Sequence, residues 1–204
     1  MTSVAPIERL DSPRYEQARV AVGRAFCDYP LMVYVAPEVA RRAPAVTTLY
    51  GAILWDAFRW GEVHVTPDVV GVCAWLPPEK SVPTFWRQVR SGMLALPFDF
   101  GWRAFRTLSL YGDAAAKLHH DYAPMPHYYL AAIGVVPQRQ GQGIGSAVMQ
   151  PMLGRADDQK VHCWLDTHKE ENVRLYQRHG FEVSQKVDLA GHPVPVWGML
   201  RRPR

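Results

Sequence analysis

Three glycines alternate with other small or polar residues in the segment Gln140-Gly141-Gln142-Gly143-Ile144-Gly145-Ser146. An apolar run over 128–136 precedes this segment, and apolar residues recur three and four positions apart after it, so the predicted order is strand, turn and helix. Such a turn directs several backbone N–H groups and the positive end of a helix dipole at one place, where a phosphate is held without a basic side chain. The segment therefore predicts a binding site for a phosphate-bearing ligand.

The spacing of these glycines excludes two common phosphate-binding turns. Ser146 stands where the dinucleotide fingerprint G-x-G-x-x-G requires its third glycine. No lysine lies between Gln140 and Gln159, so the Gly-Lys-Ser/Thr end of a P-loop is absent as well. The remaining pattern is Gln140-x-x-Gly143-x-Gly145, which on its own is also compatible with a tight turn that binds nothing.

A second pattern lies in residues 165–183, after the next predicted strand. Asn172 and Tyr176 are four residues apart, so on a helix their side chains share one face and reach the same ligand. Gly180-Phe181 follows and is typical of a helix end and the start of a further strand. Taken singly, the two side chains are also compatible with a half-buried aromatic anchor and a solvent-facing asparagine.

Both patterns together, in this order and about 30 residues apart, resemble the two signature halves of the GNAT superfamily of acyl-CoA-dependent N-acyltransferases. A wider likeness, over most of the chain except parts of 81–126, is to the puromycin N-acetyltransferases and their bacterial relatives. It rests on the runs AFCDYP (25–30), GVCAWLPPE (71–79), QGQGIGSAVMQP (140–151) and LYQRHGFEV (175–183). The resemblance implies an α/β (α+β) fold with a mixed, mostly antiparallel sheet that is splayed at the cofactor site and flanked by helices. It also implies a helical insertion at about 81–126.

The resemblance implies acetyl-CoA as the co-substrate, with no metal. The strand over 133–136 would pair with the pantetheine arm, the N–H groups near Gly134 to Val136 would polarise the thioester carbonyl, and the glycine turn would hold the pyrophosphate. The expected cofactor-binding residues are Ile133, Gly134, Val135, Val136, Gln140, Gly141, Gln142, Gly143, Ile144, Gly145, Ser146, Asn172 and Tyr176.

The resemblance also implies roles for the reacting groups. Tyr176 is the expected general acid to the departing thiolate. The general base stays open between His127, whose intrinsic pKa suits a base near neutrality, Asp166 at the end of the following strand, and an ordered water. The expected substrate-binding residues are Phe26, Asp28, Tyr29 and Trp75.

Length and composition favour one domain over 1–204 in a reducing cytoplasm. Lys and Arg total 23 against 19 for Asp and Glu, and no basic cluster marks a nucleic-acid surface. Three scattered cysteines suit neither a disulfide framework nor a zinc site. No segment reaches the ~18 apolar residues of a membrane span. We therefore expect no nucleic-acid and no membrane partner, and leave the oligomeric state open, with a homodimer among the alternatives.

The first half of the chain predicts a strand, two helices and a hairpin, followed by a helical segment. We expect a strand over 4–10, a helix from Tyr15 capped by Asp11 or Ser12 and ended before Pro30, and an amphipathic helix over 46–58. A hairpin follows over 62–66 and 69–76. The aromatic-rich segment 81–126 predicts two or three helices with breaks near Pro97 and Gly112, and most of its rings are expected in the core.

The second half predicts a short strand over 161–165, a capping box at Thr167-His168-Lys169-Glu170, and a final hairpin over 181–189 and 194–200. The acceptor is expected to be a small amine with an aromatic or apolar body, of the aminonucleoside-antibiotic kind. The basis is that 81–126 is rich in aromatic residues and has more Lys and Arg than Asp, which does not suit polycationic substrates. The alternatives are a protein or peptide N-acetyltransferase and an acyl-CoA-binding domain without turnover.

Overall fold

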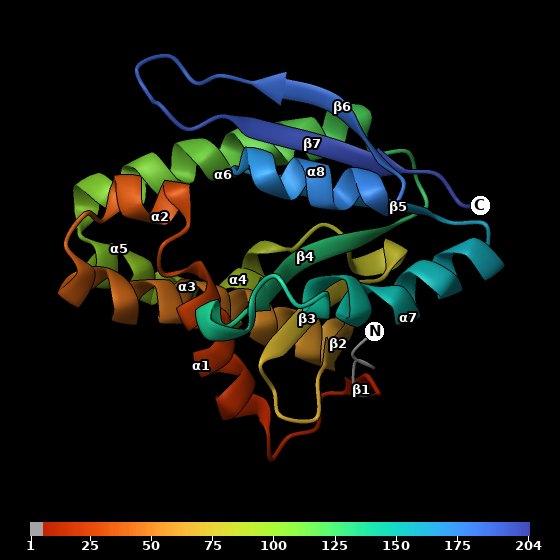
Figure 1. The fold of residues 1–204 in the computed structure, drawn as a ribbon. Helices are drawn as coiled ribbons and strands as arrows, with labels where there is room; N and C mark the ends of the chain where they lie inside the picture. The colour runs from red at the N-terminus through yellow and green to blue at the C-terminus, as the bar shows by residue number, and fades with distance from the viewer. Residues whose placement is uncertain (1–5) are drawn as a thin grey trace.

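The computed structural model describes residues 6–204, which form a seven-stranded sheet in the order β1-β2-β3-β4-β5-β7-β6 (Figure 1). The strands are β1 Glu8–Arg9, β2 Glu62–Val65, β3 Gly71–Leu76, β4 His127–Val135, β5 His162–Thr167, β6 Phe181–Val187 and β7 Val196–Arg201. Every neighbouring pair is antiparallel except β4 and β5, which are parallel. The predicted mixed, mostly antiparallel sheet is confirmed.

Helices cover both faces of this sheet. They are α1 Tyr15–Phe26, α2 Pro30–Val35, α3 Val39–Trp60, α4 Phe85–Arg90, α5 Leu96–Phe100, α6 Trp102–Tyr122, α7 Ile144–Asp158 and α8 Glu170–Arg178, with 3-10 turns η1 Pro78–Lys80, η2 Met93–Ala95 and η3 Pro137–Arg139. The long helices α1, α3 and α6 bury one apolar cluster against one face, whereas α7 and α8 bury a second cluster against the other. Within residues 6–204, no helix combines the length and hydropathy of a membrane span.

The pairing of β4 with β5 is short. It joins His127 to His162, Tyr128 to Cys163 and Tyr129 to Trp164, and stops there. Beyond this point β4 continues beside β3 only, and β5 continues beside β7 only. The sheet is therefore splayed over the second half of β4, as expected, and the facing edges of the two strands are left without strand partners.

Helix α1 lies directly on the splayed part of β4. A Cβ atom at Gly134 would stand 2.8 Å from the Cβ of Ala25 and 3.4 Å from the Phe26 ring. The close approach therefore requires glycine at 134, because any side chain would push α1 away. The packing fixes the end of α1, and with it Phe26 and Tyr29, beside the opening of the sheet.

Several local predictions need correction at helix starts. Thr167 is the last residue of β5, and its hydroxyl is bonded to the Tyr29 hydroxyl at 2.9 Å, so it does not cap α8. Helix α1 begins at Tyr15, and Asp11 accepts the Arg14 N–H at 3.2 Å instead of capping from the N-cap position. The first helix does end before Pro30, at Phe26, and Pro30 itself begins α2, because its ring fits the first helical turn.

Other strand and helix predictions, in both halves of the chain, hold with shifted ends. The expected strand over 4–10 is reduced to β1, and residues 4 and 5 lie outside the described residues. The predicted hairpin over 62–76 is confirmed as β2 and β3, and the amphipathic helix over 46–58 is the second half of α3. The final hairpin is confirmed as β6 and β7.

The 81–126 segment is helical as expected, and a new helix begins beside Pro97. The predicted break near Gly112 and the predicted burial of the rings need correction. Gly112 sits inside the continuous helix α6, because one exposed helical glycine costs only ~1 kcal/mol and buried Tyr111 and Leu118 hold the helix on the core. The expectation that most of the rings are buried is wrong. Only Phe100 and Tyr111 are buried, whereas five rings are exposed: Phe85, Trp86, Phe98, Trp102 and Tyr122.

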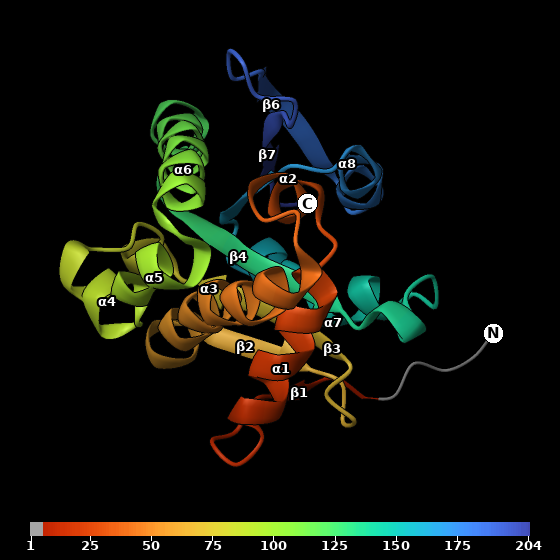
Figure 2. The same ribbon diagram turned by 90° about the vertical axis from the view of Figure 1, so that its left-hand side faces the viewer.

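The exposed rings follow from how this segment is attached. A buried ion pair between Arg87 of α4 and Asp56 of α3, with Arg87 also donating to the Lys80 carbonyl at 2.9 Å, holds α4 at the edge of the molecule. Leu96 and Phe100 of α5 are buried there too. Figure 2 shows α4 and α5 together at one edge, away from α7 and α8. Only one side of each short helix meets the core.

Two glycines with equal space around them should respond in opposite ways to alanine. No atom lies within 4 Å of a Cβ built at Gly112 or at Gly92, but Gly92 has a φ of 91°. We expect Gly112→Ala to raise the free energy of unfolding by ~0.5–1 kcal/mol, and Gly92→Ala to lower it by ~1 kcal/mol. Urea denaturation of both variants measures this. A loss of stability in Gly112→Ala would show that α6 is interrupted there.

Candidate active site

The glycine turn before α7 has the backbone shape of an anion site. Gly141 and Gly143 have φ values of 75° and 80°, and a Cβ at either position would meet no atom within 4 Å. The first hydrogen bond of α7 runs from the Ala147 N–H to the Gly143 carbonyl at 3.0 Å. The N–H groups of residues 144–146 therefore have no partner within the 15-residue helix and, with its dipole, favour an anion.

Side-chain hydrogen bonds in and beside this turn hold its conformation. The Gln140 amide donates to the Val135 carbonyl at 2.9 Å, which ties the turn to the end of β4. Arg139 donates to the Gln142 side chain at 3.1 Å and pairs with Asp68 at 3.3 Å. These bonds use the side chains of Gln140 and Gln142 within the protein, so an anion at this turn meets mainly backbone N–H groups.

A cleft of ≈ 480 Å³ runs from this turn along the splayed edge of β4 and beneath α8. All of the expected cofactor-binding residues line it except Val136 and Gln142, and Phe26 and Tyr29 line it as well. Its lining residues are Ala25, Phe26, Tyr29, Ile133, Gly134, Val135, Arg139, Gln140, Gly141, Gly143, Ile144, Gly145, Ser146, Lys169, Glu171, Asn172, Leu175, Tyr176 and Arg178. The structure thus brings both sequence patterns to one place.

The hydrogen-bond ladder of β4 decides which backbone groups face the cleft. The Val136 N–H donates to the Val70 carbonyl at 2.9 Å, so it is not free. Alternation along an antiparallel pair then directs Gly134 toward Val72 and turns Ile133 and Val135 to the splayed side. The Gln140 bond to the Val135 carbonyl agrees with this. Of the three N–H groups expected at 134–136, that of Val135 faces the opening, together with that of Ile133.

Tyr176 enters the cleft from α8. Its ring packs edge-on against Phe181 at 5.9 Å, and within residues 6–204 its hydroxyl makes no hydrogen bond. Burial raises the pKa of Tyr176 well above 10, with further contributions from Tyr29, Cys73 and the Asp166 charge. The phenol therefore stays protonated at neutral pH and has a hydrogen to donate.

A carboxylate stands where the sheet opens. Asp166 lies two residues past Trp164, the last residue of β5 that pairs with β4, and accepts a hydrogen bond from the Tyr129 hydroxyl at 2.8 Å. It does not line the cleft itself, but its charge contributes to the raised pKa values of Tyr29, Tyr50, Tyr129 and Tyr176. In all four, burial is the largest cause. Asp166 thus serves as the common negative charge of a tyrosine cluster.

Tyr29 links the two halves of this region. Its hydroxyl is bonded to Thr167 at 2.9 Å and accepts the His168 N–H at 2.7 Å, and burial raises its pKa to about 12. Phe26 stacks on Tyr50 with ring centroids 3.6 Å apart. The aromatic side chains at the end of α1 therefore lie against the end of β5, beside Asp166.

Three residues expected in the site lie elsewhere. His127 is buried at the start of β4, where β4 and β5 are still paired, and its Nε2 is 2.6 Å from that of His119. Trp75 is buried on the face of the sheet covered by α7. Asp28 points outward, with its side chain 80% exposed, and pairs with Arg42 at 3.0 Å. None of the three lines the cleft.

The structure also shows functional candidates that the sequence patterns missed. Tyr50 and Tyr129 belong to the tyrosine cluster, and His179 touches the first turn of α7. Tyr50 sits in an amphipathic helix stripe and Tyr129 in an apolar strand, where sequence alone favours ordinary core packing. No sequence signal marks His179, because its partner is 33 residues away. The described residues contain no group of three or more His, Cys, Asp or Glu that could hold a metal ion.

A family model described as the acetyltransferase (GNAT) family matches residues 66–181, which is more than half of the chain. The chain belongs to the GNAT acetyltransferase family. The match includes β3, the splayed strand, the glycine turn, α7 and α8. It does not include α1 and α3, which supply Phe26, Tyr29 and Tyr50.

Individual relatives of this acetyltransferase are distant. An uncharacterized N-acetyltransferase of Schizosaccharomyces pombe, C550.08, is 24% identical over 208 residues, covering 96% of this chain and 83% of its own length. A Corynebacterium glutamicum structure described as histone acetyltransferase HPA2 and related acetyltransferase has a TM-score of 0.68 at 20% identity, over 99% of this chain and 98% of its own. Arylalkylamine N-acetyltransferase 2 of Aedes aegypti has a TM-score of 0.62 at 13% identity, over 97% and 98%. The two structures show that the fold is shared.

The family uses acetyl-CoA, and the cleft of this acetyltransferase suits that molecule. The empty space at Gly141 and Gly143 leaves room for phosphate oxygens to approach the backbone N–H groups. The unpaired edge of β4 at Ile133 and Val135 offers hydrogen-bonding groups of the kind that amides of an extended chain require. A phosphate-bearing molecule with an amide-containing arm therefore matches both ends of the cleft.

A hydrogen-bonded relay fixes the orientation of Ser146 at the phosphate end. Gln150 Nε2 is 3.3 Å from His179 Nδ1, and His179 Nε2 is 2.8 Å from Ser146 Oγ. Because the Gln150 amide nitrogen only donates, His179 Nδ1 accepts and its Nε2 carries the hydrogen that Ser146 receives. Burial and three nearby arginines lower the pKa of His179, which keeps the ring neutral. The hydroxyl hydrogen of Ser146 is therefore free to be donated to a ligand in the cleft.

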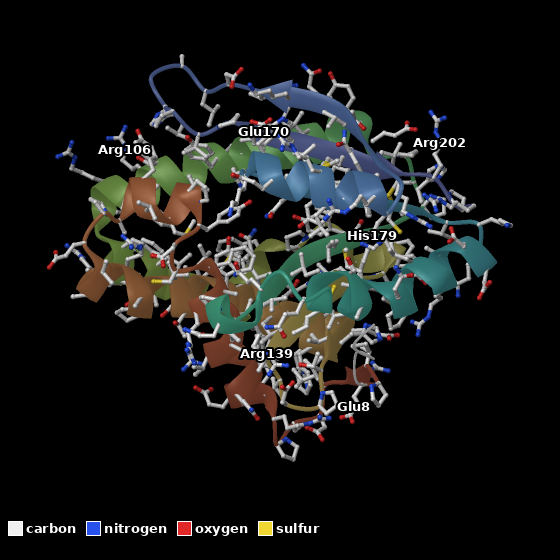
Figure 3. All side chains as sticks on the ribbon, in the orientation of Figure 1. Glu8, Arg106, Arg139, Glu170, His179 and Arg202 are labelled. Atoms are coloured by element: carbon white, nitrogen blue, oxygen red, sulfur yellow. The ribbon has the colours of Figure 1, made fainter. Side chains whose placement is uncertain are left out.

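Figure 3 places His179 where α8 ends above α7. We expect His179→Ala to weaken CoA binding roughly fivefold to tenfold, because Ser146 then loses the donor that orients it. Ser146→Ala should weaken CoA binding by a similar factor or more. The double variant should bind CoA as tightly as Ser146→Ala alone. His179→Gln, which keeps a donor, should recover part of the loss. Titration calorimetry with CoA measures all four, and fully additive losses would show that His179 acts independently of Ser146.

Proposed function

We propose that this GNAT acetyltransferase transfers the acetyl group of acetyl-CoA to the amine of a small molecule with an aromatic or apolar body, of the kind found in aminonucleoside antibiotics. The proposal rests chiefly on one observation. The splayed end of the cleft is bordered by Phe26 and by a cluster of tyrosines around the Asp166 carboxylate. An aromatic surface with one negative charge suits a single ammonium group on a planar or apolar body.

Acetyl-CoA, when bound, supplies a thioester carbonyl that an amine attacks, with a thiolate as the leaving group. The turn of residues 141–146 holds the phosphates through its backbone N–H groups. The Val135 and Ile133 N–H groups face the opening and polarise the carbonyl oxygen, since fixed donors stabilise charge that develops there. This backbone edge is rigid because β3 and α1 pack against β4.

Tyr176 serves as the general acid. Its hydroxyl has no hydrogen-bond partner within residues 6–204, lies in the cleft and keeps its proton at neutral pH. It donates that proton to the leaving sulfur, and Asn172, on the same face of α8, holds the pantetheine amide. Burial, which sets the pKa of Tyr176, also keeps water from competing for the proton.

Asp166 supplies the negative charge for the amine at the splayed end of the cleft, although its side chain does not line the cleft. One of its carboxylate oxygens is held by Tyr129, and the other has no hydrogen-bond donor among the described residues. It attracts the acceptor ammonium by its charge and takes up one ammonium proton before attack, because a free amine is the nucleophile. After attack the nitrogen loses a second proton, which replaces the one that Tyr176 gives to the leaving sulfur. His127, the other expected base, is removed from this role by its burial and its bonds to His119 and to the Pro124 carbonyl.

The shape of the acceptor follows from the aromatic border. Phe26 and Tyr29 line the cleft, whereas no residue of 81–126 does, so the segment on whose composition the sequence-based expectation rested does not form the acceptor site. The mosquito enzyme of the same fold is named for arylalkylamines, which are amines of this class. A protein or peptide acceptor remains the competing substrate class, and the assay below includes it.

Removal of the Tyr176 hydroxyl should slow the chemical step. We expect Tyr176→Phe to lower kcat by ~10² or more with little change in CoA affinity, the pattern of a lost general acid. Tyr128→Phe is a matched control, because Tyr128 is also buried but its hydroxyl bonds Gln159 outside the cleft. Stopped-flow single-turnover assays measure the step. Equal rates for Tyr176→Phe and the wild type would reject the assignment.

The acceptor class is tested by a competitive panel with acetyl-CoA. The panel contains puromycin-like aminonucleosides, arylalkylamines, aminoglycosides, polyamines and peptides with free N-terminal or lysine amines. We expect the highest kcat/KM for an aromatic or apolar amine, because the border around Asp166 buries an apolar body and holds one charge. A polyamine, aminoglycoside or peptide at the top of the panel would refute the acceptor class and leave the acetyltransferase activity itself unaffected.

A further inference from the structure

Several large apolar side chains are exposed on the helices at one edge of the molecule. We name residues 80–106, which comprise the end of η1, α4, η2, α5 and the start of α6, the aromatic lobe. Six of its large apolar side chains are each 60% to 85% exposed: Val82, Phe85, Trp86, Leu94, Phe98 and Trp102. Soluble monomers rarely gather so many, and such patches mark interaction surfaces.

The aromatic lobe is well attached rather than loosely packed. Its inner side is held by the buried Arg87–Asp56 ion pair and by buried Leu96 and Phe100. Thr84 caps α4 by accepting the Arg87 N–H. Each short helix therefore contacts the core through one side only. The rings on its other side have no part of the described chain to pack against and stay exposed.

The lobe lies apart from the cleft. No residue of 80–106 lines it, and Figure 2 shows α4 and α5 at the opposite edge from α7. Its exposed rings are therefore not part of the acceptor or cofactor site. A partner that covers them must be different from the amine and from acetyl-CoA.

The charges of the lobe restrict that ligand. Lys80, Arg90, Arg103 and Arg106 are exposed, and within residues 6–204 none of them is in an ion pair, whereas Asp99 is the one acidic residue of the segment. Figure 3 shows Arg106 directed outward at this edge. A second copy of the same surface would bring like charges together, which is unfavourable. An anionic surface offers the missing countercharges.

We infer that the aromatic lobe is a membrane-docking surface that places this acetyltransferase on an anionic lipid bilayer. Trp and Phe are the side chains that settle at the boundary between headgroups and acyl chains, and Lys and Arg beside them bind anionic headgroups. The lobe is a set of outward-facing short helices, which suits a broad surface. This inference departs from the sequence-based expectation of no membrane partner, which rested on the absence of an apolar segment long enough to span a bilayer.

Docking by this surface keeps the catalytic cleft open. The cleft is lined by β4, the glycine turn and α8, and none of these belongs to the lobe. A bilayer at α4 and α5 would therefore leave acetyl-CoA and a dissolved or membrane-bound amine free to reach the site. Apolar amines concentrate at bilayers, so the proposed acceptor class and the docking surface are compatible.

The test is co-sedimentation of the full chain with vesicles of phosphatidylcholine alone and of phosphatidylcholine with phosphatidylglycerol. We expect binding to the anionic vesicles that weakens as salt rises. The combined variant Trp86→Ser and Phe98→Ser should lose at least tenfold in partitioning. Arg90→Gln, Arg103→Gln and Arg106→Gln together should lose on the order of 10²-fold, since each basic residue near such a surface contributes roughly fivefold.

Matched controls distinguish vesicle binding by the lobe from nonspecific adsorption of the protein. Met125→Ser removes a side chain that is 65% exposed outside the lobe, and Arg202→Gln removes an exposed arginine at the other end of the molecule. Both should bind vesicles like the wild type, and all variants should keep CoA binding. Vesicle binding that the lobe variants do not change would overturn the inference. So would light scattering that shows a wild-type dimer dissociated by Trp86→Ser and Phe98→Ser, because a second copy would then cover the surface.

Discussion

The separation of β4 from β5 is the constraint on which the rest of the site depends. Buried backbone N–H and carbonyl groups must be paired, yet beyond Tyr129 and Trp164 the two strands have no partner across the gap. One of these groups is paired within the protein, because the Gln140 side-chain amide donates to the Val135 carbonyl. The rest is left open to an extended ligand. Under the proposed function, strand-edge hydrogen bonds hold the arm of acetyl-CoA, and the adjacent helix terminus holds its phosphates.

The same opening sets the electrostatics of the acceptor end. Tyr29, Tyr50, Tyr129 and Tyr176 are buried around it, and burial combined with the Asp166 charge keeps each phenol protonated. A cluster of neutral hydroxyls around one carboxylate can donate hydrogens and hold a cation without carrying more negative charge. The arrangement therefore suits a proton donor and an ammonium site within the same cluster.

The aromatic lobe shows how a surface can be separated from a site within one chain. Arg87, Leu96 and Phe100 turn inward and hold α4 and α5 against α3, while the neighbouring rings and arginines turn outward. The inward residues stabilise the lobe, so the outward residues are free to differ without loss of the fold. The cleft and the lobe lie on different edges, and each can change without the other.

The sequence by itself determined the elements and patterns that depend on near neighbours. It predicted the strand, glycine turn and helix at 128–153, the Asn172–Tyr176 face and both hairpins, because periodicity and turn chemistry are local properties. Only the tertiary structure decided which aromatic rings are buried, that Trp75 and His127 lie away from the cleft, and that Thr167 bonds Tyr29 instead of capping α8. It also paired His179 with Ser146 across 33 residues. Burial and hydrogen-bond partners depend on what packs against a side chain, and that neighbour comes from elsewhere in the chain.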